Sequence, residues 1–302
     1  MGETAFLIGQ VFNGFSVASL FVLAALGLAL SFGLMRVINM AHGEMLMLGG
    51  YLAYLTILVV PGPLGILAAM PVAFIGAALV GAVLESTIIH RLSSRPLDTL
   101  LATWGVSLIL QQAARDMFGP IGVAVNAPNW LNHTMSITSG PLAGLTLPDT
   151  RLFILLVTAL VLAGLGLILS RTRLGLYVRA VNQDRSTAAA MGVNARRIDL
   201  LVFSLGTGVA GMAGVILALL GPVTPSVGQS YIVPAFLVVI LGGLGSLVGT
   251  TIASIMVGMI SAAAEIFVDV SVAQVMILVF VILFLQFRPQ GVVAVRSRAL
   301  EG

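Results

Sequence analysis

The sequence predicts an all-α, polytopic membrane helix bundle, and three observations support this fold class. The 302-residue chain is 59% hydrophobic and only 8% charged, whereas soluble domains carry charge at about a quarter of their positions. Its mean hydropathy is +1.13. Apolar runs of about 20 residues, the length that crosses a bilayer, recur along the chain. We therefore expect about nine spans, within a range of about eight to ten.

The expected spans follow one another, with polar or glycine- and proline-marked breaks between most of them. They cover residues 5–30, 37–60, 64–89, 98–118, 152–169, 198–220, 231–244, 246–266 and 271–287. The apolar stretch from Ile232 to Phe267 is too long for one helix, so we expect a break at 242–246. Glu3 stands where a signal peptide would carry positive charge, so the first run is expected to be retained.

Five runs precede an arginine-rich loop, and four follow it. We divide the single transmembrane domain (1–302) into a first half (1–170), a cytoplasmic loop (171–197), a second half (198–287) and a cytoplasmic tail (288–302). Because the first half holds an odd number of spans, the second half enters the membrane the other way up. This arrangement is typical of inverted-topology repeats in transporters.

Arginine placement predicts the orientation, because cytoplasmic loops of membrane proteins are enriched in basic residues. The 119–148 connection contains neither Lys nor Arg and should lie outside. The residues expected on the cytoplasmic side are Arg36, Arg91, Arg95, the six arginines of 171–197, Arg288, Arg296 and Arg298. Nine spans satisfy these assignments only with the N-terminus outside and the C-terminus in the cytoplasm.

Composition also excludes several functions. The chain has no lysine, so it lacks the Gly-Lys-Ser/Thr of a P-loop and cannot itself be a P-loop ATPase. It has no cysteine, which excludes disulfides and thiolate chemistry. The net charge of +3 comes without basic stretches interleaved with aromatic residues, so nucleic acid is not an expected partner.

Candidate substrate-pathway residues lie in three places. His42 and Glu44 lie about one turn inside an apolar span, where ionisable groups are costly and usually functional. The alternative is that both lie at the headgroup level, with Asn39 or His42 capping the helix and Glu44 favoured by its dipole. No third ligand is near, so no metal site is expected there.

The second place is the fourth expected span, where polar residues recur every four positions and form one stripe on a helix. The stripe consists of Thr99, Thr103, Ser107, Gln111 and Arg115. It could line a path for a small polar solute, or it could form hydrogen bonds between helices. The third place is the glycine- and proline-rich segment 221–230, which contains Gln229 and precedes the second span of the second half, as 39–44 does in the first. Helices broken at matching places indicate a substrate path. Glu265 and Asp269 are expected to be solvated.

The arginine-rich loop is predicted to dock onto a cytoplasmic protein. Within it, Asn182 could cap a short helix, Asp184 suits the first turn, and Gly192 could end it. Segment 186–191 presents a small apolar surface between arginines, which fits a groove in a partner. The residues expected to contact that partner are Arg179, Arg185, Ala188, Ala189, Ala190, Met191, Gly192 and Arg196. Anionic lipid also accounts for the arginines.

Five segments of the chain resemble the membrane permease of branched-chain amino-acid-type ABC importers, and most closely its urea-type member. They are VINMAHGEMLMLGGYLAY (37–54), RPLDTLLATWGVSLILQQ (95–112), TRLGLYVRAVNQDRSTAAAMGV (172–193), LGPVTPSVGQSYIV (220–233) and LGGLGSLVGT (241–250). The second and fourth segments carry the urea-type likeness. Pro234 departs from it, because urea-type permeases tend to have an acidic residue there.

The resemblance implies a bacterial inner-membrane permease that pairs with a sister permease as a heterodimer. Two ATP-binding subunits, which bind ATP and Mg²⁺, would lie beneath it, and a periplasmic solute-binding protein would deliver the solute. No cofactor is expected on this chain, and segment 179–197 would couple it to the ATPases. Urea is the first expected solute, followed by branched-chain amino acids and short amides.

Two other functions remain to be weighed. An ion-coupled secondary transporter would use Glu44 or His42 as a proton site. An intramembrane serine protease would use Ser107, which follows Gly105 in a Gly-x-Ser pattern and needs a histidine as base. His133 is the histidine that follows the serine, and it lies in the outer loop, which argues against this activity.

Overall fold

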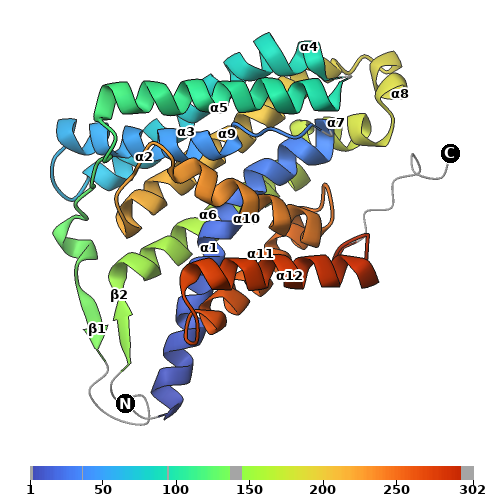
Figure 1. Cartoon of the computed structure of the whole chain (residues 1–302). Helices are drawn as coiled ribbons and strands as arrows, with labels where there is room; N and C mark the ends of the chain where they lie inside the picture. Colours follow the sequence, from blue (N-terminus) through green and yellow to red (C-terminus); the bar gives the residue numbers. More distant parts are fainter. Residues whose placement is uncertain (1–2, 36, 94, 137–144, 294–302) are drawn as a thin grey trace.

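The computed structural model describes residues 3–35, 37–93, 95–136 and 145–293, and the regular structure of these residues is almost entirely helical (Figure 1). The long helices are α1 (Glu3–Met35), α2 (His42–Val59), α3 (Gly65–Leu84), α5 (Pro96–Phe118), α6 (Asp149–Arg171), α9 (Ala195–Leu220), α10 (Val227–Gly242), α11 (Leu247–Ala264) and α12 (Val270–Phe287). The shorter pieces are the π-helical turn η1 (Glu85–Ile89), α4 (His90–Leu92), the 3₁₀ turn η2 (Asn129–Leu131), α7 (Arg173–Gln183) and α8 (Arg185–Ala190). Two strands, β1 (Thr134–Ser136) and β2 (Thr146–Pro148), pair antiparallel.

Within the described residues, each of the nine apolar runs forms one long helix, and the predicted all-α membrane class is confirmed. Seven helices in the described part of the chain are long and apolar enough to cross a membrane. The other two are α10, which is apolar but only 16 residues long, and α5, whose polar stripe lowers its hydropathy. The predicted break also forms, because α10 ends at Gly242. The two glycines that follow, Gly243 and Gly245, have φ values of 100° and 85°, which glycine adopts readily.

The bundle has two distinct ends (Figure 1). Helix α1 begins near the β1–β2 hairpin, and Arg151 at the start of α6 donates a hydrogen bond to Asn13 of α1. Helices α4 and α8 lie at the opposite end. The 119–148 connection and the arginine-rich loop are therefore at opposite ends, as the sequence predicts. Arg36, Arg296 and Arg298 lie outside the described residues.

The packing of the two halves is reciprocal. Helix α1 packs along α11, and α9 packs along α3. Helix α9 also contacts α2, and α1 contacts α10. The helix triples α1–α2–α3 and α9–α10–α11 therefore make equivalent contacts, as two related halves would. Helices α1 and α9 begin at opposite ends of the bundle, which is the relation that the odd number of spans predicts (Figure 1).

The centre of the bundle is closely packed, because glycines let helix backbones touch. A Cβ atom on Gly27 of α1 would collide with the carbonyl oxygen of Gly206 in α9. A Cβ on Gly49 of α2 would likewise collide with Gly211 of α9. Helix α9 is thus held against two partner helices along its length, which makes it the central element of the bundle.

Candidate functional site

Helices α2 and α10 begin inside the bundle, and their first turns touch. A Cβ on Gly228 would lie 2.5 Å from the carbonyl carbon of Gly43, and a Cβ on Gly43 would collide with Gly228 in turn. The side chain of Val223 lies beside Gly50, further along α2. The chain between Val223 and Gly228 therefore runs back along α2 before α10 begins. The two polar helix starts that the sequence marks as equivalent meet at one point.

His42 and Glu44 both lie in the interior at this point. Each residue is only 1% exposed, so neither is in contact with solvent. The Nε2 atom of His42 is 3.0 Å from the carbonyl oxygen of Ala24 in α1. Ala41 is the N-cap residue of α2, so neither predicted side chain caps the helix, and the Oδ1 of Asn39 accepts instead from the backbone N–H of Ala41.

The polar stripe of α5 is the face that packs against the start of α2. Oε1 of Glu44 accepts hydrogen bonds from Oγ of Ser107 and Nε2 of Gln111, each at 2.8 Å. One turn further down, Oγ1 of Thr103 accepts from the backbone N–H of Met40. The structure therefore brings two separately predicted candidate groups into one buried contact.

The remaining stripe residues lie at the ends of α5. Thr99 is buried and donates through Oγ1 to the carbonyl oxygen of Leu92 at 2.7 Å. Arg115 is exposed and donates to Gln112 of its own helix. Thr99 thus bonds within the α4–α5 connection, and the hydrogen bond of Arg115 stays within α5.

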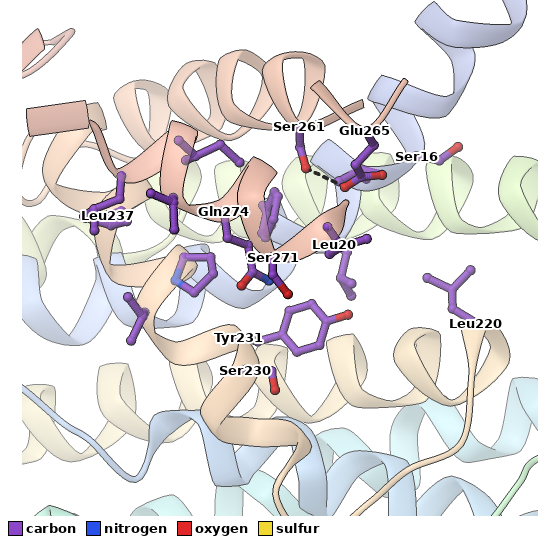
Figure 2. Close-up of a pocket in the computed structure, with 18 of the residues that line it drawn as sticks. Ser16, Leu20, Leu220, Ser230, Tyr231, Leu237, Ser261, Glu265, Ser271 and Gln274 are labelled. Carbon is purple, nitrogen blue, oxygen red and sulfur yellow. Dashed lines mark hydrogen bonds between the residues drawn. The ribbon is translucent and has the colours of Figure 1, made fainter. Parts of the chain in front are cut away.

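A cavity of about 540 Å³ lies beside α10, between α1, α11 and α12. Its polar groups include Gln229, Ser230, Tyr231, Glu265, Ser271 and Gln274. Figure 2 shows the Tyr231 ring projecting into the space near Gln274 and Ser271, with Ser261 bonded to Glu265 at the rim. Gln229 is therefore the one predicted pathway residue that lines this cavity, whereas the other six belong to the α2–α5 contact, the α1–α2 contact or the α4–α5 connection.

The cavity has the chemistry of a small-solute site. Aliphatic and aromatic side chains such as Leu20, Phe21 and Leu237 form most of its wall. One cation, Arg151, and one carboxylate, Glu265, also line it. Mostly apolar pockets with a few polar groups are typical small-molecule sites. Among the residues described, no group of three or more acidic or histidine side chains could hold a metal ion.

The arginine-rich loop folds into α7 and α8. Asp184 rather than Asn182 is the N-cap of α8, because its carboxylate accepts from the backbone N–H groups of Ser186 and Thr187. These bonds, chiefly the one from Thr187, lower the pKa of Asp184 from 3.8 to about 2. Asn182 instead lies within α7, so the predicted cap was wrong by two residues. Gly192, with φ of 85°, follows the helix as predicted.

The predicted docking residues divide into outward and inward ones. Ala189, Ala190 and Met191 are exposed, and Met191 is 82% exposed. Ala188 is buried and faces the bundle. The arginines Arg179, Arg185 and Arg196 surround this segment, and Gly192 beside Met191 is also exposed. Arg179 donates to the carbonyl oxygen of Leu169 at 2.5 Å, and Arg185 pairs with Asp199 at 2.5 Å.

Sequence reasoning missed three kinds of residue. Glu265 is exposed, as predicted, but the sequence did not indicate that it lines the cavity. Sequence reasoning passed over Gln274, a polar residue in an apolar span, which was a usable signal. It also missed the buried carboxylates Glu85 and Asp199, because a single acid near a helix end is indistinguishable from a solvated one.

Similarity to known proteins extends over nearly the whole chain. The family described as "Branched-chain amino acid transport system / permease component" matches residues 10–286. The high-affinity branched-chain amino acid transport system permease protein BraD of Pseudomonas aeruginosa is 31% identical over 306 residues, which is 97% of each chain. LivH of Salmonella typhimurium is 28% identical over 95% of each chain. LivH of Methanocaldococcus jannaschii, a probable permease of the same kind, is 30% identical over 85% of this chain and 80% of its own. No solved structure matches.

The residues matched by the family include all the site features described above. The family match runs from α1 to the last turn of α12, so it includes both helix starts, the cavity and the arginine-rich loop. The apolar helices make the chain a multi-pass membrane protein. The chain therefore belongs to the family of permease components of branched-chain amino acid transport systems.

Proposed function

We propose that this chain is the permease subunit of an ATP-driven importer, in which separate subunits hydrolyse ATP and drive alternating access. One observation carries the proposal. Helix α8 presents Ala189, Ala190 and Met191 outward at one end of the bundle, among arginines. A chain without lysine has no P-loop of its own, so the exposed apolar surface of Ala189, Ala190 and Met191 is best explained by a partner that supplies the energy.

The proposed assembly contains a second permease subunit, two ATP-binding subunits that hold ATP and Mg²⁺, and a periplasmic solute-binding protein. Family membership as a permease component supports the existence of further components. In this assembly the end that bears α4 and α8 faces the cytoplasm of a bacterial cell, and the N-terminus and the β1–β2 hairpin lie outside. The abundance of arginine at the α8 end supports this orientation.

Urea is the proposed solute, because segments 95–112 and 220–233 resemble the urea-type permeases. The second segment is well placed for selection, because it leads into α10 with Gln229 and Ser230 at the cavity. Amide, hydroxyl and carboxylate groups there could bond to a small amide. The first segment forms the α5 contact with Glu44.

Branched-chain amino acids are the second candidate. The relatives BraD and LivH are named for them. The cavity also offers Arg151 and Glu265, which could take a carboxylate and an ammonium group, while Leu20 and Leu237 could contact an aliphatic side chain.

The docking surface is tested with Ala189→Glu in the complete complex, reconstituted into proteoliposomes. A carboxylate in the apolar contact should reduce ATP-dependent uptake about tenfold or more, since burying an unpaired charge opposes docking. Membrane insertion should stay normal. The matched control is Ala124→Glu, at an exposed alanine in the connection at the opposite end of the bundle. Normal uptake and normal co-purification of the ATP-binding subunits with Ala189→Glu would contradict the proposal.

The solute is tested with radiolabelled urea and radiolabelled leucine in the same proteoliposomes. Saturable, ATP-dependent urea uptake would support the urea assignment, and leucine uptake in its place would select the second candidate. Uptake that persists without the ATP-binding subunits and collapses with the proton gradient would contradict the importer and indicate an ion-coupled secondary transporter.

A further inference from the structure

An ion pair between a half-exposed arginine and a buried aspartate joins α8 to the central helix α9. Asp199 lies just inside the start of α9, and its side chain is 4% exposed. Its Oδ1 atom is 2.5 Å from Nη2 of Arg185, the first residue of α8, whose side chain is 50% exposed. A buried carboxylate is expensive to leave without a partner, so the pair resists separation more strongly than a surface pair would.

The covalent connection between the two helices is a short turn. It runs through Met191 to Asn194 and includes Gly192, whose φ of 85° marks a sharp change of direction. The backbone N–H of Val193 donates back to the carbonyl oxygen of Ala188. This turn attaches the C-terminal end of α8 to α9. The ion pair between Arg185 and Asp199 is a second attachment, at the other end of α8, and two attachments fix an orientation.

The turn η1, which follows α3, brings a second buried carboxylate, Glu85, to the start of α9. This side chain is 1% exposed and lies on the π-helical turn η1, a local irregularity that often marks functional sites. Glu85 shares a cavity of about 280 Å³ with Arg196 and Asn194 at the start of α9. Its Oε1 atom is 4.0 Å from Nδ1 of His90 and accepts no hydrogen bond. We call Arg185, Asp199 and Glu85 the α8 joint.

We propose that the α8 joint transmits movement of α8 to the bundle, with Arg185 and Asp199 as positioning residues. The inference rests on the proposed function, in which a partner acts on α8. A displaced α8 would then pull α9 through the ion pair. Because Gly206 and Gly211 of α9 touch α1 and α2, the movement would reach the contact between Gly43 and Gly228. Without the pair, the N-terminal end of α8 would lose its ionic attachment to α9.

Energetic coupling is the first readout, in the complete complex in proteoliposomes with radiolabelled urea and leucine. Asp199→Asn keeps the shape of the side chain but removes its charge. We expect uptake per ATP hydrolysed to fall about tenfold, within the usual range of coupling free energies. Arg185→Gln should give the same loss, and the double exchange Arg185→Asp with Asp199→Arg should restore part of it. Glu85→Gln should have a smaller effect.

The matched control is Arg173→Gln, which removes one exposed arginine from the same loop. The fraction of ATP-binding subunit that co-purifies separates loss of coupling from loss of assembly. Wild-type uptake per ATP in both Asp199→Asn and Arg185→Gln would overturn the proposal.

The second readout needs no cargo. The chain has no cysteine, so spin labels attach only at introduced ones, Met191→Cys on the turn after α8 and Leu201→Cys on α9, both exposed. In lipid nanodiscs we expect a narrow distance distribution, which Asp199→Asn broadens. A broadened distribution with unchanged uptake per ATP would make the pair merely structural and refute the joint.

The two readouts also separate the two proposals. Uptake by the wild-type complex that is independent of ATP would refute the proposed function. The label distances would still decide whether the ion pair orients α8, and an unchanged distribution in Asp199→Asn would refute the joint on its own.

Discussion

The starts of α2 and α10 occupy matching places in the two halves, yet their polar side chains have different surroundings. At the start of α2, Oε1 of Glu44 accepts from two side chains of α5, while its buried Oε2 accepts no hydrogen bond from the residues that the structure describes. At the start of α10, Gln229 and Ser230 face a cavity of about 540 Å³ (Figure 2). The two starts meet through Gly43 and Gly228.

This difference shows that broken helices at equivalent places need not share a role. Ser107 and Gln111 already donate to Glu44 and are poorly placed to bind a solute, whereas groups that face a cavity can exchange water for it. We therefore infer that α2 and α5 form a structural contact, while α10, α11 and α12 offer a site for the solute. Three predictions test this difference between the two helix starts, and a fourth concerns the cap of α8.

The largest effect is expected where the two starts meet. Gly43→Ala would put a methyl group into the backbone of Gly228, and we expect it to cost about 3 kcal/mol or more, because neither backbone can move away. Gly105→Ala is the control, since a Cβ there meets nothing within 4 Å and alanine favours a helix. Thermal unfolding of the purified chain in detergent measures both. Equal unfolding midpoints in the two variants would mean that the starts do not touch.

The next effect concerns the α2–α5 contact. Gln111→Leu removes one of the two donors to Glu44 and should lower stability by about 1–3 kcal/mol, with little change in the KM for uptake. Gln112→Leu makes the same replacement at the exposed neighbouring position. Unfolding midpoints and uptake kinetics are both measured. A raised KM with unchanged stability would place the stripe on the solute path instead.

A smaller stability effect but a larger kinetic one is expected at the cavity. Gln229→Leu should raise the KM for uptake about fivefold, the equivalent of one lost hydrogen bond, and change stability by less than about 0.5 kcal/mol. Gln274→Leu should behave alike, with Gln112→Leu again as control. An unaltered KM in both cavity variants would remove this cavity from the path.

The smallest effect is expected at Asp184, outside both helix starts. Its pKa in the fold, about 2, is below the ordinary value of 3.8. The ionised cap therefore stabilises α8 at pH values above 3.8, and this stabilisation is lost as the pH falls through about 2. Amide hydrogen exchange in α8, corrected for the intrinsic pH dependence, should show lower protection below about pH 3 than at about pH 5. Asp184→Asn, which caps without a charge, should lose this pH dependence, and an identical pH profile in both proteins would contradict the assignment.

Much of the fold could be predicted because a bilayer restricts it to long apolar helices. The nine runs, the break after Gly242 and the separation of the two loops all follow from the printed residues. The α5 stripe could be recognised by its spacing. Its partner could not, because the spacing shows which side chains share a face but not which helix packs against that face. The stripe meets Glu44 only after α2 and α5, far apart in sequence, come together.

The cavity and the α8 joint were harder to predict for the same reason. Glu265 and Asp199 are single acids near helix ends, where solvent is the default expectation. One lines a cavity formed mainly with residues of other helices, and the other is buried and paired with Arg185 of α8. Composition and periodicity alone determined that this chain lives in a membrane, lacks its own ATPase motif and exposes an arginine-rich loop. Only tertiary packing decided which polar groups are satisfied and which remain free to bind, since that depends on contacts between segments that the sequence keeps apart.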